Sequence, residues 1–529
     1  MQQEARRILY GQDARNALLQ GAKIVYEAVR STYGASGGNV VIQKEWGDPV
    51  LTRDGVTVAK DVDIADKAQN QGAKLIKQAS KKTNDRAGDG TSATVVLAYH
   101  ILDEANRLVA TGYNPMEIRK QILSSVEYVK NFIDSNTQPV TDKKLVEVAT
   151  IACGDDQIGK LIADTVIQVG ESGGVTIEEH MGISTEREMV EGFYFDRGFC
   201  DFRMITNFAA LKAEHTDMPI LITKKRINTN AQIVPLIEKT MQSTNRKIMI
   251  VGEISGEALE TLIVNKQQGK IDALAVAIPN FGDMEHLFLE DVALMTGGRV
   301  IEEAENMDKV TLDDLGLAGK VISTENTTTI LDGDGDLEQI ELRIRSIKDR
   351  MKEETNTLYQ ERLEMRLAKL TGKIAVIRVG ASSDVAREEL KFRVEDAVNA
   401  TQNARKEGIV AGGGTTLLFA AQNTPKDFSG ILKKALPKCY DELLSNAGED
   451  AGYRRELTLQ AGYGHGYNLR NMTTEPIDLF KAGIIDPALT LKQVVENAAE
   501  VAGNIVTAGC VMVFEDKKEE DKSNGQPSA

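Results

Sequence analysis

Apolar residues recur at helical spacing through much of the first 130 residues. Between Ala14 and Ser31 they stand at Ala17, Leu18, Ala22, Val25, Ala28 and Val29. This spacing is close to the 3.6-residue period of an amphipathic helix. The same pattern returns from Ala68 to Lys82 and from Thr91 to Leu108. We therefore predict three helices in these segments.

Strand patterns appear first near residue 40 and then in the middle of the chain. The run N-V-V-I-Q-K from Asn39 and the run V-L-T at 50–52 flank the turn residues Gly47-Asp48-Pro49, which predicts a hairpin. From about Thr176, short runs such as I-L-I-T at Ile220 and K-I-M-I-V-G at Lys247 alternate with helical segments. Such alternation is typical of an α/β domain.

The last third of the chain returns to helix. Apolar residues at helical spacing predict a helical pair that is antiparallel or kinked, with one stripe at Ile340, Ile344, Ile347 and Met351 and another at Leu363, Leu367 and Leu370. A strand-like run begins at Lys373, and the final 120 residues are mostly helical in pattern. The polar tail from Lys517 is predicted to be disordered. The overall expectation is a multidomain α+β protein.

Composition narrows the class of protein. A chain of 529 residues suggests three or so domains at ~150 residues each. The net charge of −16 argues against a nucleic-acid partner, since a polyanion would be repelled. Four scattered cysteines suggest a reducing compartment. We find no signal core and no apolar run that could span a membrane, so we expect a cytoplasmic protein with no membrane partner.

One glycine-rich segment, N-D-R-A-G-D-G-T-S-A-T from Asn84, combines features of a phosphate site. Gly88 and Gly90 surround Asp89 immediately before a predicted helix, and free N–H groups at a helix start bind phosphate. Asp89 would repel that phosphate unless a cation such as Mg²⁺ lay between them. A simple turn before a capped helix explains the segment equally well, so both interpretations stay open here.

Four further fragments are ambiguous when taken singly. T-Y-G-A-S-G-G-N from Thr32 and G-I-V-A-G-G-G-T-T from Gly408 are tight turns on the simplest interpretation. L-T-R-D-G-V-T from Leu51 places two charges on a turn, and V-E-D-A from Val394 places a carboxylate on a helix.

Other kinds of site are excluded. The chain has no Walker P-loop, no histidines at metal-ligand spacing and no nucleophile elbow. D-G-D-G-D at Asp332 lacks the twelfth-position Glu of a calcium loop, having Arg343 instead.

Seven fragments in this order resemble conserved blocks of the group I (GroEL-type) chaperonins. They are T-Y-G-A-S-G-G-N-V, T-R-D-G-V-T-V-A, N-D-R-A-G-D-G-T, V-E-G-F-Y-F-D-R-G, R-V-E-D-A, E-G-I-V-A-G-G-G and G-I-I-D-P. The resemblance extends from about Gly11 to Phe514. It implies a helical equatorial domain from 1–135 and 407–529, a small α/β intermediate hinge domain from 136–190 and 375–406, and an α/β apical domain from 191–374.

The resemblance also implies an ATPase site. Mg²⁺ would be held by Asp89, with K⁺ as a further candidate ion, and Asp54 and Asp396 would act on the attacking water. Because Asp396 would belong to the hinge domain, hydrolysis would require domain closure. The implied nucleotide contacts are Thr32, Tyr33, Gly34, Ala35, Arg53, Asp89, Gly90, Thr91, Ser92, Ala93, Gly413, Asn468, Leu469, Arg470 and Asp486.

The implied partners are copies of the same chain in a ring, expected to be heptameric and double, together with non-native proteins and a GroES-type co-chaperonin. The absence of an obvious lid insertion favours a separate co-chaperonin over the built-in lid of group II. Clients would bind apolar apical side chains at Phe199, Met204, Val234, Ile237, Leu259, Ile263 and Val264. The residues themselves also allow ordinary amphipathic helices that face a core.

Several positions depart from the family pattern. Thr91-Ser92-Ala93 replaces a triple threonine, Ala35 replaces a proline, and Gly38 stands where a basic residue is common. Arg203 stands at a usually aromatic position beside the altered Cys200 and Phe202, and Lys373 at a usually glycine hinge. The usual C-terminal Gly-Met repeats are absent.

Two other functions compete with the folding chamber. The chain would be a diverged holdase or scaffold if it bound nucleotide without cycling. It would be a small-molecule enzyme if it had a second substrate pocket, for which the sequence offers no residues. Retention of Asp54, Asp89 and Asp396 favours the ATP-driven chaperone.

Overall fold

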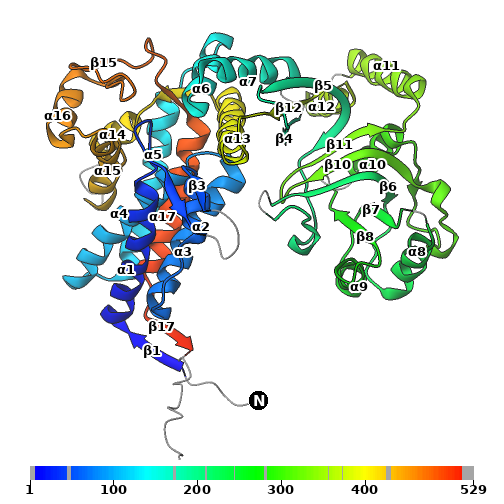
Figure 1. Cartoon of the computed structure of the whole chain (residues 1–529), viewed down its shortest axis with the longest axis horizontal. Coiled ribbons are helices and arrows are strands. Elements are labelled where there is room, and N and C mark those ends of the chain that lie inside the picture. Colours follow the sequence, from blue (N-terminus) through cyan, green and yellow to red (C-terminus); the bar gives the residue numbers. More distant parts are fainter. Residues whose placement is uncertain are drawn as a thin grey trace, which may run out of the picture. The chain divides into compact units, whose positions relative to one another are not determined.

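A computed structural model of the chain describes residues 6–43, 49–170, 174–208, 211–243, 245–278, 283–354, 357–371, 373–423 and 430–514. The chain forms two compact units. Unit 1 combines Met1–Ala163 with Ser382–Ala529, and unit 2 is Asp164–Ala381 (Figure 1). Both unit boundaries fall inside the segments predicted to form the intermediate domain, and the three-domain division stays a prediction.

Unit 1 is mostly helical. Its helices are α1 Gly11–Arg30, α2 Gly55–Asp61, α3 Lys67–Ala87, α4 Thr91–Ala110, α5 Pro115–Ser135, α6 Asp142–Cys153, α13 Asp384–Glu407, α14 Thr415–Gln422, α15 Gly430–Asn446, α16 Ala451–Ala461 and α17 Ala488–Val506. A further helix, α7 Asp156–Val169, crosses the unit boundary. The three helices predicted near the N-terminus are confirmed as α1, α3 and α4.

The helices α4 and α17 lie at the centre of the core of unit 1, and both bury apolar residues along most of their length. A helix that is apolar nearly all round belongs in the interior. α1 and α3 pack beside this pair and cross each other closely. A Cβ atom at Gly21 would lie 1.8 Å from the Gln69 carbonyl oxygen, and one at Gly72 would lie 2.0 Å from that of Leu18. The two glycines therefore permit a crossing that larger residues would obstruct.

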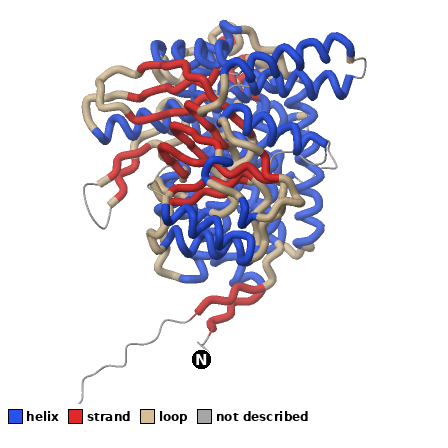
Figure 2. Tube along the Cα trace, turned by 90° about the vertical axis from the view of Figure 1, so that its right-hand side faces the viewer, coloured by secondary structure: helices blue, strands red, loops and turns tan. Residues whose placement is uncertain are grey.

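Unit 1 also contains four short antiparallel pairs of strands. β1 Arg6–Tyr10 pairs with β17 Cys510–Phe514, and this terminal ribbon stands beyond the helices in Figure 2. β2 Val40–Ile42 pairs with β3 Val50–Thr52, which confirms the pairing in the predicted hairpin, although Gly47 and Asp48 lie outside the described residues. The other pairs are β13 Ile409–Ala411 with β16 Ile485–Pro487, and β14 His465–Gly466 with β15 Ile477–Asp478.

Unit 2 is built on a nine-stranded mixed sheet in the order β4-β12-β5-β11-β10-β6-β7-β8, with β9 also pairing with β6. β6, β7, β8 and β9 pair in parallel, as do β4 and β12, and the other pairs are antiparallel. The strands are β4 Val175–Glu179, β5 Glu186–Phe195, β6 Ala213–Thr223, β7 Lys247–Val251, β8 Asp272–Val276, β9 Val300–Ile301, β10 Gly316–Ser323, β11 Thr328–Gly333 and β12 Lys373–Val379.

Helices accompany this sheet, so the α/β character predicted for the middle of the chain is confirmed. They are α8 Asn230–Gln242, α9 Gly256–Gln267, α10 Asp283–Thr296, α11 Leu337–Glu353 and α12 Thr357–Thr371, with short 3-10 turns η1 Phe202–Met204, η2 Met307–Lys309 and η3 Leu312–Asp314. The two apolar stripes predicted as a helical pair are α11 and α12, which contact each other.

Two further expectations concerned a membrane span and the polar tail. None of its helices is both long and apolar enough to cross a bilayer. The tail from Lys517 lies outside the described residues.

Candidate functional site

Five separate segments of unit 1 meet at one end of its helices and form the candidate site. The loop after α1 reaches the start of α4, where Thr32 Oγ1 and Ser92 Oγ lie 3.5 Å apart. The start of α2 lies beside them, because a Cβ atom at Gly55 would be 2.2 Å from Ser92 Oγ. The β13–α14 turn lies against β16, since a Cβ atom at Gly412 would be 3.0 Å from Asp486 Oδ1. The fold thus gathers nucleotide contacts predicted from distant motifs.

The first turn of α4 offers main-chain donors to an anion. Its N-cap residue is Gly90, with φ +82°, a left-handed conformation that glycine adopts without strain. Glycine has no side chain to cap the N–H groups of the turn, which leaves them available to a ligand. Ala93 is 7% exposed, so its contribution would come from its backbone. Gly90 N itself donates to Asp89 Oδ1 at 2.6 Å.

Three carboxylates at the site have raised pKa values. Burial raises the pKa of Asp89 to about 6, although the Gly90 N–H opposes the shift. Burial, and then the charge of Asp89, raise the pKa of Asp486 to about 7. Burial raises the pKa of Asp396 well above its ordinary value, and the charges of Asp89, Asp54 and Glu395 raise it further. All three side chains keep partial solvent access, as a ligand site requires.

This concentration of negative charge fits a cation held jointly with a ligand. Among the described residues, no three His, Cys, Asp or Glu side chains lie close enough together to hold a metal ion. Mg²⁺ needs few protein ligands, because it commonly takes one or two carboxylates and completes its shell with phosphate oxygens and water. The arrangement around Asp89 meets that requirement.

Asp54 has a structural role that its motif did not reveal. It is the N-cap of α2, where its carboxylate accepts hydrogen bonds from Val56 N at 3.1 Å, Thr57 N at 2.8 Å and Thr57 Oγ1 at 2.6 Å. These donors fix the orientation of its carboxylate at the start of the helix. Asp54 therefore holds a carboxylate near Asp396.

The loop after α1 is held from several sides. Arg53 Nη2 donates to the carbonyl oxygens of Gly34 at 3.0 Å and Ala35 at 3.5 Å. Asn446 Nδ2 donates to Tyr33 O at 2.9 Å. Gly34 has φ +84°, and a Cβ atom there would lie 2.2 Å from Leu443 Cδ2. The guanidinium of Arg53 therefore helps to hold the loop after α1 in shape.

The segment 468–470 adjoins the same loop, because Ser36 Oγ donates to Leu469 O at 3.1 Å. Asn468 Oδ1 accepts from the backbone N–H groups of Arg470 at 3.0 Å and Asn471 at 3.1 Å, so this oxygen shapes its own turn. The exposed Arg470 reaches toward Gly154, where its Nη2 would lie 3.3 Å from a Cβ atom. Gly413, with φ +63°, precedes α14. Sequence reasoning missed Ser36, which lies inside the first glycine motif but was not among the predicted contacts, and it missed Leu443 and Asn446, which belong to no recognisable motif.

The apolar surface predicted on unit 2 requires a correction. Met204, Ile237 and Ile263 are 0%, 5% and 0% exposed, so the expectation that they present a surface to clients is wrong for this structure. Helical spacing predicts an apolar stripe but does not say which of its members face the sheet. Val234 and Val264 are 37% and 43% exposed. Phe199 and Leu259 are partly buried against the core.

Sequence reasoning also missed Phe202, which is 69% exposed on η1. The neighbouring Arg203 joins η1 to α9. Its guanidinium bonds to Asp201 at 2.8 Å through two nitrogens, and to Glu260 at 2.9 and 2.7 Å. Ion pairs this exposed contribute modestly to stability, but their bidentate geometry fixes orientation. The departure from the family pattern at Arg203 was the feature of the sequence that could have indicated a changed surface here.

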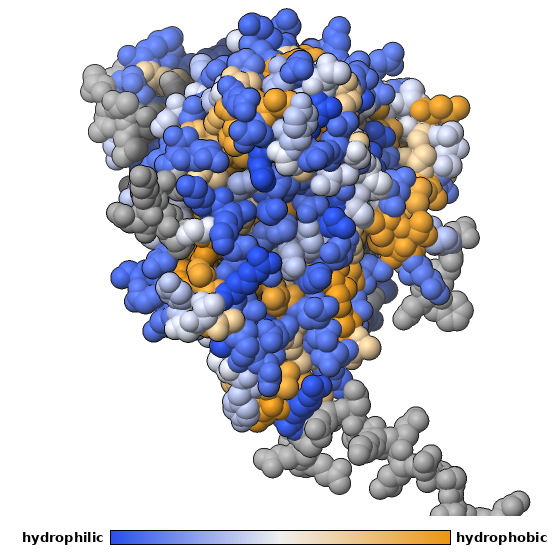
Figure 3. Space-filling model, turned by 90° about the vertical axis from the view of Figure 1, so that its left-hand side faces the viewer, coloured by the Kyte–Doolittle hydropathy of each residue, from blue (hydrophilic) through white to orange (hydrophobic). Residues whose placement is uncertain are grey.

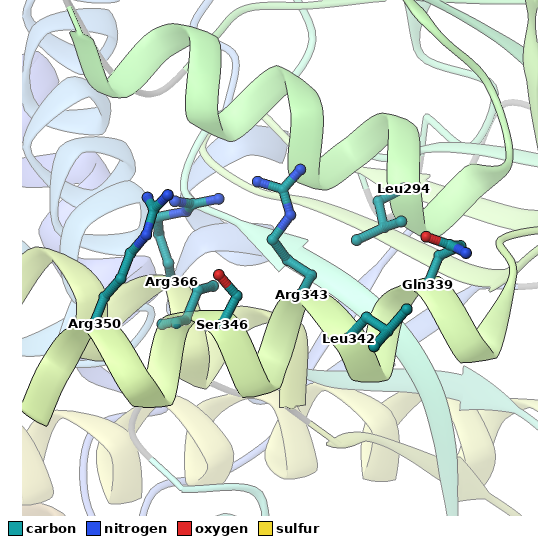
Figure 4. A pocket seen from close by; sticks show the side chains of 8 residues that line it. Leu294, Gln339, Leu342, Arg343, Ser346, Arg350 and Arg366 are labelled. Atoms are coloured by element: carbon teal, nitrogen blue, oxygen red, sulfur yellow. The ribbon is translucent and has the colours of Figure 1, made fainter.

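Unit 2 also has a recess of about 350 Å³ between α10, α11 and α12 (Figure 4). Three arginines line it, together with Leu294, Gln339, Leu342, Ser346 and Ile347. Arg366 is paired with Asp291 at 2.8 and 2.7 Å, and Arg343 with Glu290 at 3.0 Å. Arg350, the third arginine, is exposed. The recess shares no residue with the predicted nucleotide contacts.

The sequence matches the TCP-1/cpn60 chaperonin family over residues 25–515. The chain belongs to this family. Members of the family bind ATP, are ATPases and form oligomeric rings. A solved structure with the same chaperonin fold is that of chaperonin gp146 from bacteriophage EL 2 (Pseudomonas aeruginosa), determined in the presence of ATP-BeFx. The TM-score is 0.70 at 19% identity, with 96% of this chain and 99% of that chain covered. The predicted multidomain α+β chaperonin fold is confirmed.

The pKa of Asp486 gives this chaperonin a testable pH dependence. A carboxyl group that keeps its proton longer in the folded chain lowers stability as pH rises between its unfolded and folded pKa values, here from 3.8 to about 7. We expect the melting temperature of ligand-free protein to fall more steeply over this range than that of Asp486→Asn, as measured by differential scanning fluorimetry. Mg-ADP should reduce the difference by neutralising the site. Equal pH slopes for the two proteins would contradict the electrostatic account.

Proposed function

We propose that the chain is an ATP-driven molecular chaperone of the group I type, which captures non-native proteins and encloses them in a ring chamber. The observation that carries this proposal is the convergence of Asp89, Asp396 and Asp486 on two glycine-rich loops in unit 1. Closely placed carboxylates cost stability unless a cation compensates them. A scaffold that did not bind nucleotide would gain nothing from that cost.

In this proposal the main-chain N–H groups at the start of α4 bind phosphate oxygens, with the hydroxyls of Thr91 and Ser92 beside them. Mg²⁺ would be held by Asp89 and the phosphates, and would screen the negative charge between them; K⁺ is a further candidate ion. Asp486 lies at the same site, where burial and then the charge of Asp89 raise its pKa. The loop 32–35 and the segment 468–470 would contact the rest of the nucleotide.

Asp396 is the residue we assign to the chemical step. A carboxylate with a raised pKa is a better proton acceptor than an ordinary aspartate, and it suits the positioning or deprotonation of an attacking water. Asp54, which caps the N-terminus of α2, supports the same role from its position near Asp396. Asp396 therefore acts on turnover, whereas Asp89 acts on binding.

The first test separates these two roles. Asp396→Asn should leave ATP affinity nearly unchanged and lower kcat by ~10²–10⁴-fold, the usual value of a positioned acid or base. Asp89→Asn should weaken Mg-ATP binding itself, because it removes a ground-state ligand. Binding is measured by calorimetry and turnover by phosphate release. Wild-type protein that binds ATP but never hydrolyses it would indicate the holdase or scaffold alternative instead.

We further propose that clients bind unit 2 through its exposed apolar residues Val234, Val264 and Phe202, with partial contributions from Phe199 and Leu259. Apolar side chains recognise exposed apolar segments without sequence specificity, which suits a general chaperone. A separate GroES-type co-chaperonin would use the same surface. No lid-sized insertion interrupts the described residues between β6 and β8, since only α8, β7 and α9 lie there.

The client test uses surface and core residues as a matched pair. Changing Val234, Val264 and Phe202 to Ser should abolish capture of a denatured protein while the ATPase rate and the melting temperature stay close to wild type. Ile263→Ser should instead lower the melting temperature, because that side chain is fully buried. Undiminished capture by the triple variant would place client binding elsewhere.

Assembly would use the strand pairs that unit 1 leaves open. The terminal ribbon β1–β17 and the hairpin β2–β3 are two-stranded, so their outer backbone groups lack strand partners within the described chain. Ribbons of this size are marginal in water, and open edges favour pairing with another chain. They also expose Ile8, Tyr10, Val41, Leu51, Met512 and Phe514. Figure 3 shows hydrophobic residues among hydrophilic ones toward the ribbon end of unit 1.

Wild-type protein should elute as a ring many times its chain mass of 57.8 kDa, with seven-fold symmetry in electron micrographs. Val41→Asp together with Met512→Asp should shift the protein to smaller species, because each places a charge on one of the ribbons. Tyr453, which is 62% exposed on α16, serves as a control, and Tyr453→Asp should leave the ring intact. A monomeric wild type at micromolar concentration, with and without nucleotide, would contradict the ring.

A further inference from the structure

Two side chains of α13 donate hydrogen bonds to the backbone that precedes Asp89. Asn403 Nδ2 donates to the Ala87 carbonyl oxygen at 2.6 Å, and Asn399 Nδ2 donates to that of Gly88 at 3.3 Å. On the other side of Asp89, Thr94 Oγ1 donates to the Gly90 carbonyl oxygen at 3.0 Å. Side-chain donors therefore occupy three carbonyls of the loop 87–90.

These donors belong to a larger polar network inside the apolar core. Asn403 Nδ2 also reaches Thr490 Oγ1 on α17 at 3.2 Å. Thr83 Oγ1 on α3 lies 2.9 Å from Thr94 Oγ1 and accepts from Asn497 Nδ2 at 3.0 Å. Each of these five side chains is at least nine-tenths buried. Asn497 Oδ1 is the one atom of these five side chains that is buried without a hydrogen-bond partner. The remaining bonds favour a single arrangement, because breaking any of them leaves a further unpaired group in the core.

The network determines how the loop faces the ligand. The carbonyl groups of Ala87, Gly88 and Gly90 are bonded on the core side of the loop. The N–H groups at the start of α4 are therefore left to face a ligand on the opposite side. Gly88 has φ +62°, and a Cβ atom there would lie 2.2 Å from Asn399 Nδ2. Only glycine permits that approach, so the Asn399 bond depends on the same glycine that forms the turn.

The two asparagines share a helical face with Asp396. They follow it by three and seven residues on α13, spacings that place all three on one side of the helix. The contact that brings Asp396 toward Asp89 therefore also forms both amide bonds. The amide bonds therefore join the loop that carries Asp89 to the helix that carries Asp396, and they hold the two carboxylates near each other in spite of their like charge.

We propose that Asn399 and Asn403 are positioning residues for ATP hydrolysis, which hold α13 against the loop 87–90 so that Asp396 stays at the reacting end of the site. This inference rests on the proposed ATPase function. The asparagines contact neither nucleotide nor water in this role, and they act through Asp396. Their loss should therefore lower turnover more than nucleotide affinity.

Asn399 is the residue to change, because it is only partly buried and its loss should be tolerated by the fold. Asn399→Ala should lower kcat by roughly three- to tenfold, the range expected for one neutral hydrogen bond, with little change in the Kd for ATP. Asn399→Gln keeps the amide and should recover part of the rate. Asn399→Asp removes the donor and adds a negative charge beside the loop, so it should lower kcat at least as much as Asn399→Ala.

Asn136→Ala is the matched control, because Asn136 Nδ2 makes the same kind of bond to the Phe132 carbonyl oxygen at 2.8 Å in unit 1, at the end of α5. It should leave kcat unchanged.

A double-mutant cycle decides whether Asn399 acts through Asp396. In an Asp396→Ala background, Asn399→Ala should have no further effect on the residual single-turnover rate. Independent, multiplicative losses, or an Asn399→Ala variant that hydrolyses ATP at the wild-type rate, would overturn the proposal. Failure of wild-type protein to bind or hydrolyse ATP in the same assays would overturn the proposed function instead.

Discussion

Electrostatic repulsion among aspartates is the constraint on which unit 1 depends. Asp89, Asp396 and Asp486 come from a loop, a helix and a strand that are far apart in the sequence, and each has a raised pKa. A fold gathers like charges in a desolvated place only if other interactions compensate the cost. In this chaperonin the compensation within the chain comes from packing and from buried amides, and a bound cation would supply the remainder.

Close helix packing brings these three aspartates to the same place. Gly21 and Gly72 let α1 and α3 cross at a distance that no Cβ atom would permit, and α4 and α17 fill the centre with apolar side chains. The loops that follow α1 and α3 then end at the same place. Side chains that lie outside every motif, such as Leu443 and Asn446, hold the loop after α1 in shape. The site is therefore a property of the core as much as of its own residues.

Hydrophobic periodicity was enough to predict the helices α1, α3 and α4 and the strand pair β2–β3, because local pattern determines such elements. The glycine motifs and the family resemblance identified the segments that meet at the site. Periodicity could not show that Ile237 on α8 and Ile263 on α9 are buried, since the apolar stripe of each helix also contains an exposed valine, Val234 or Val264. It also gave no sign of the Arg203–Glu260 pair or of Asn399, because those contacts join residues 57 and 311 positions apart.

The position of α13 links binding to chemistry in thermodynamic terms. Its contact with the loop 87–90 is favoured by two amide bonds and opposed by the repulsion between Asp396 and Asp89. In the proposed function, a cation at Asp89 would weaken only the opposing interaction, and it would shift the equilibrium toward the docked helix. Because such coupling is reciprocal, the docked helix must bind the cation more tightly than the undocked one. If only the amide bonds acted, α13 would stay docked on the loop 87–90 without ligand. If only the charge repulsion acted, α13 would not dock at all. The balance between the two makes the placement of Asp396 depend on what occupies the site.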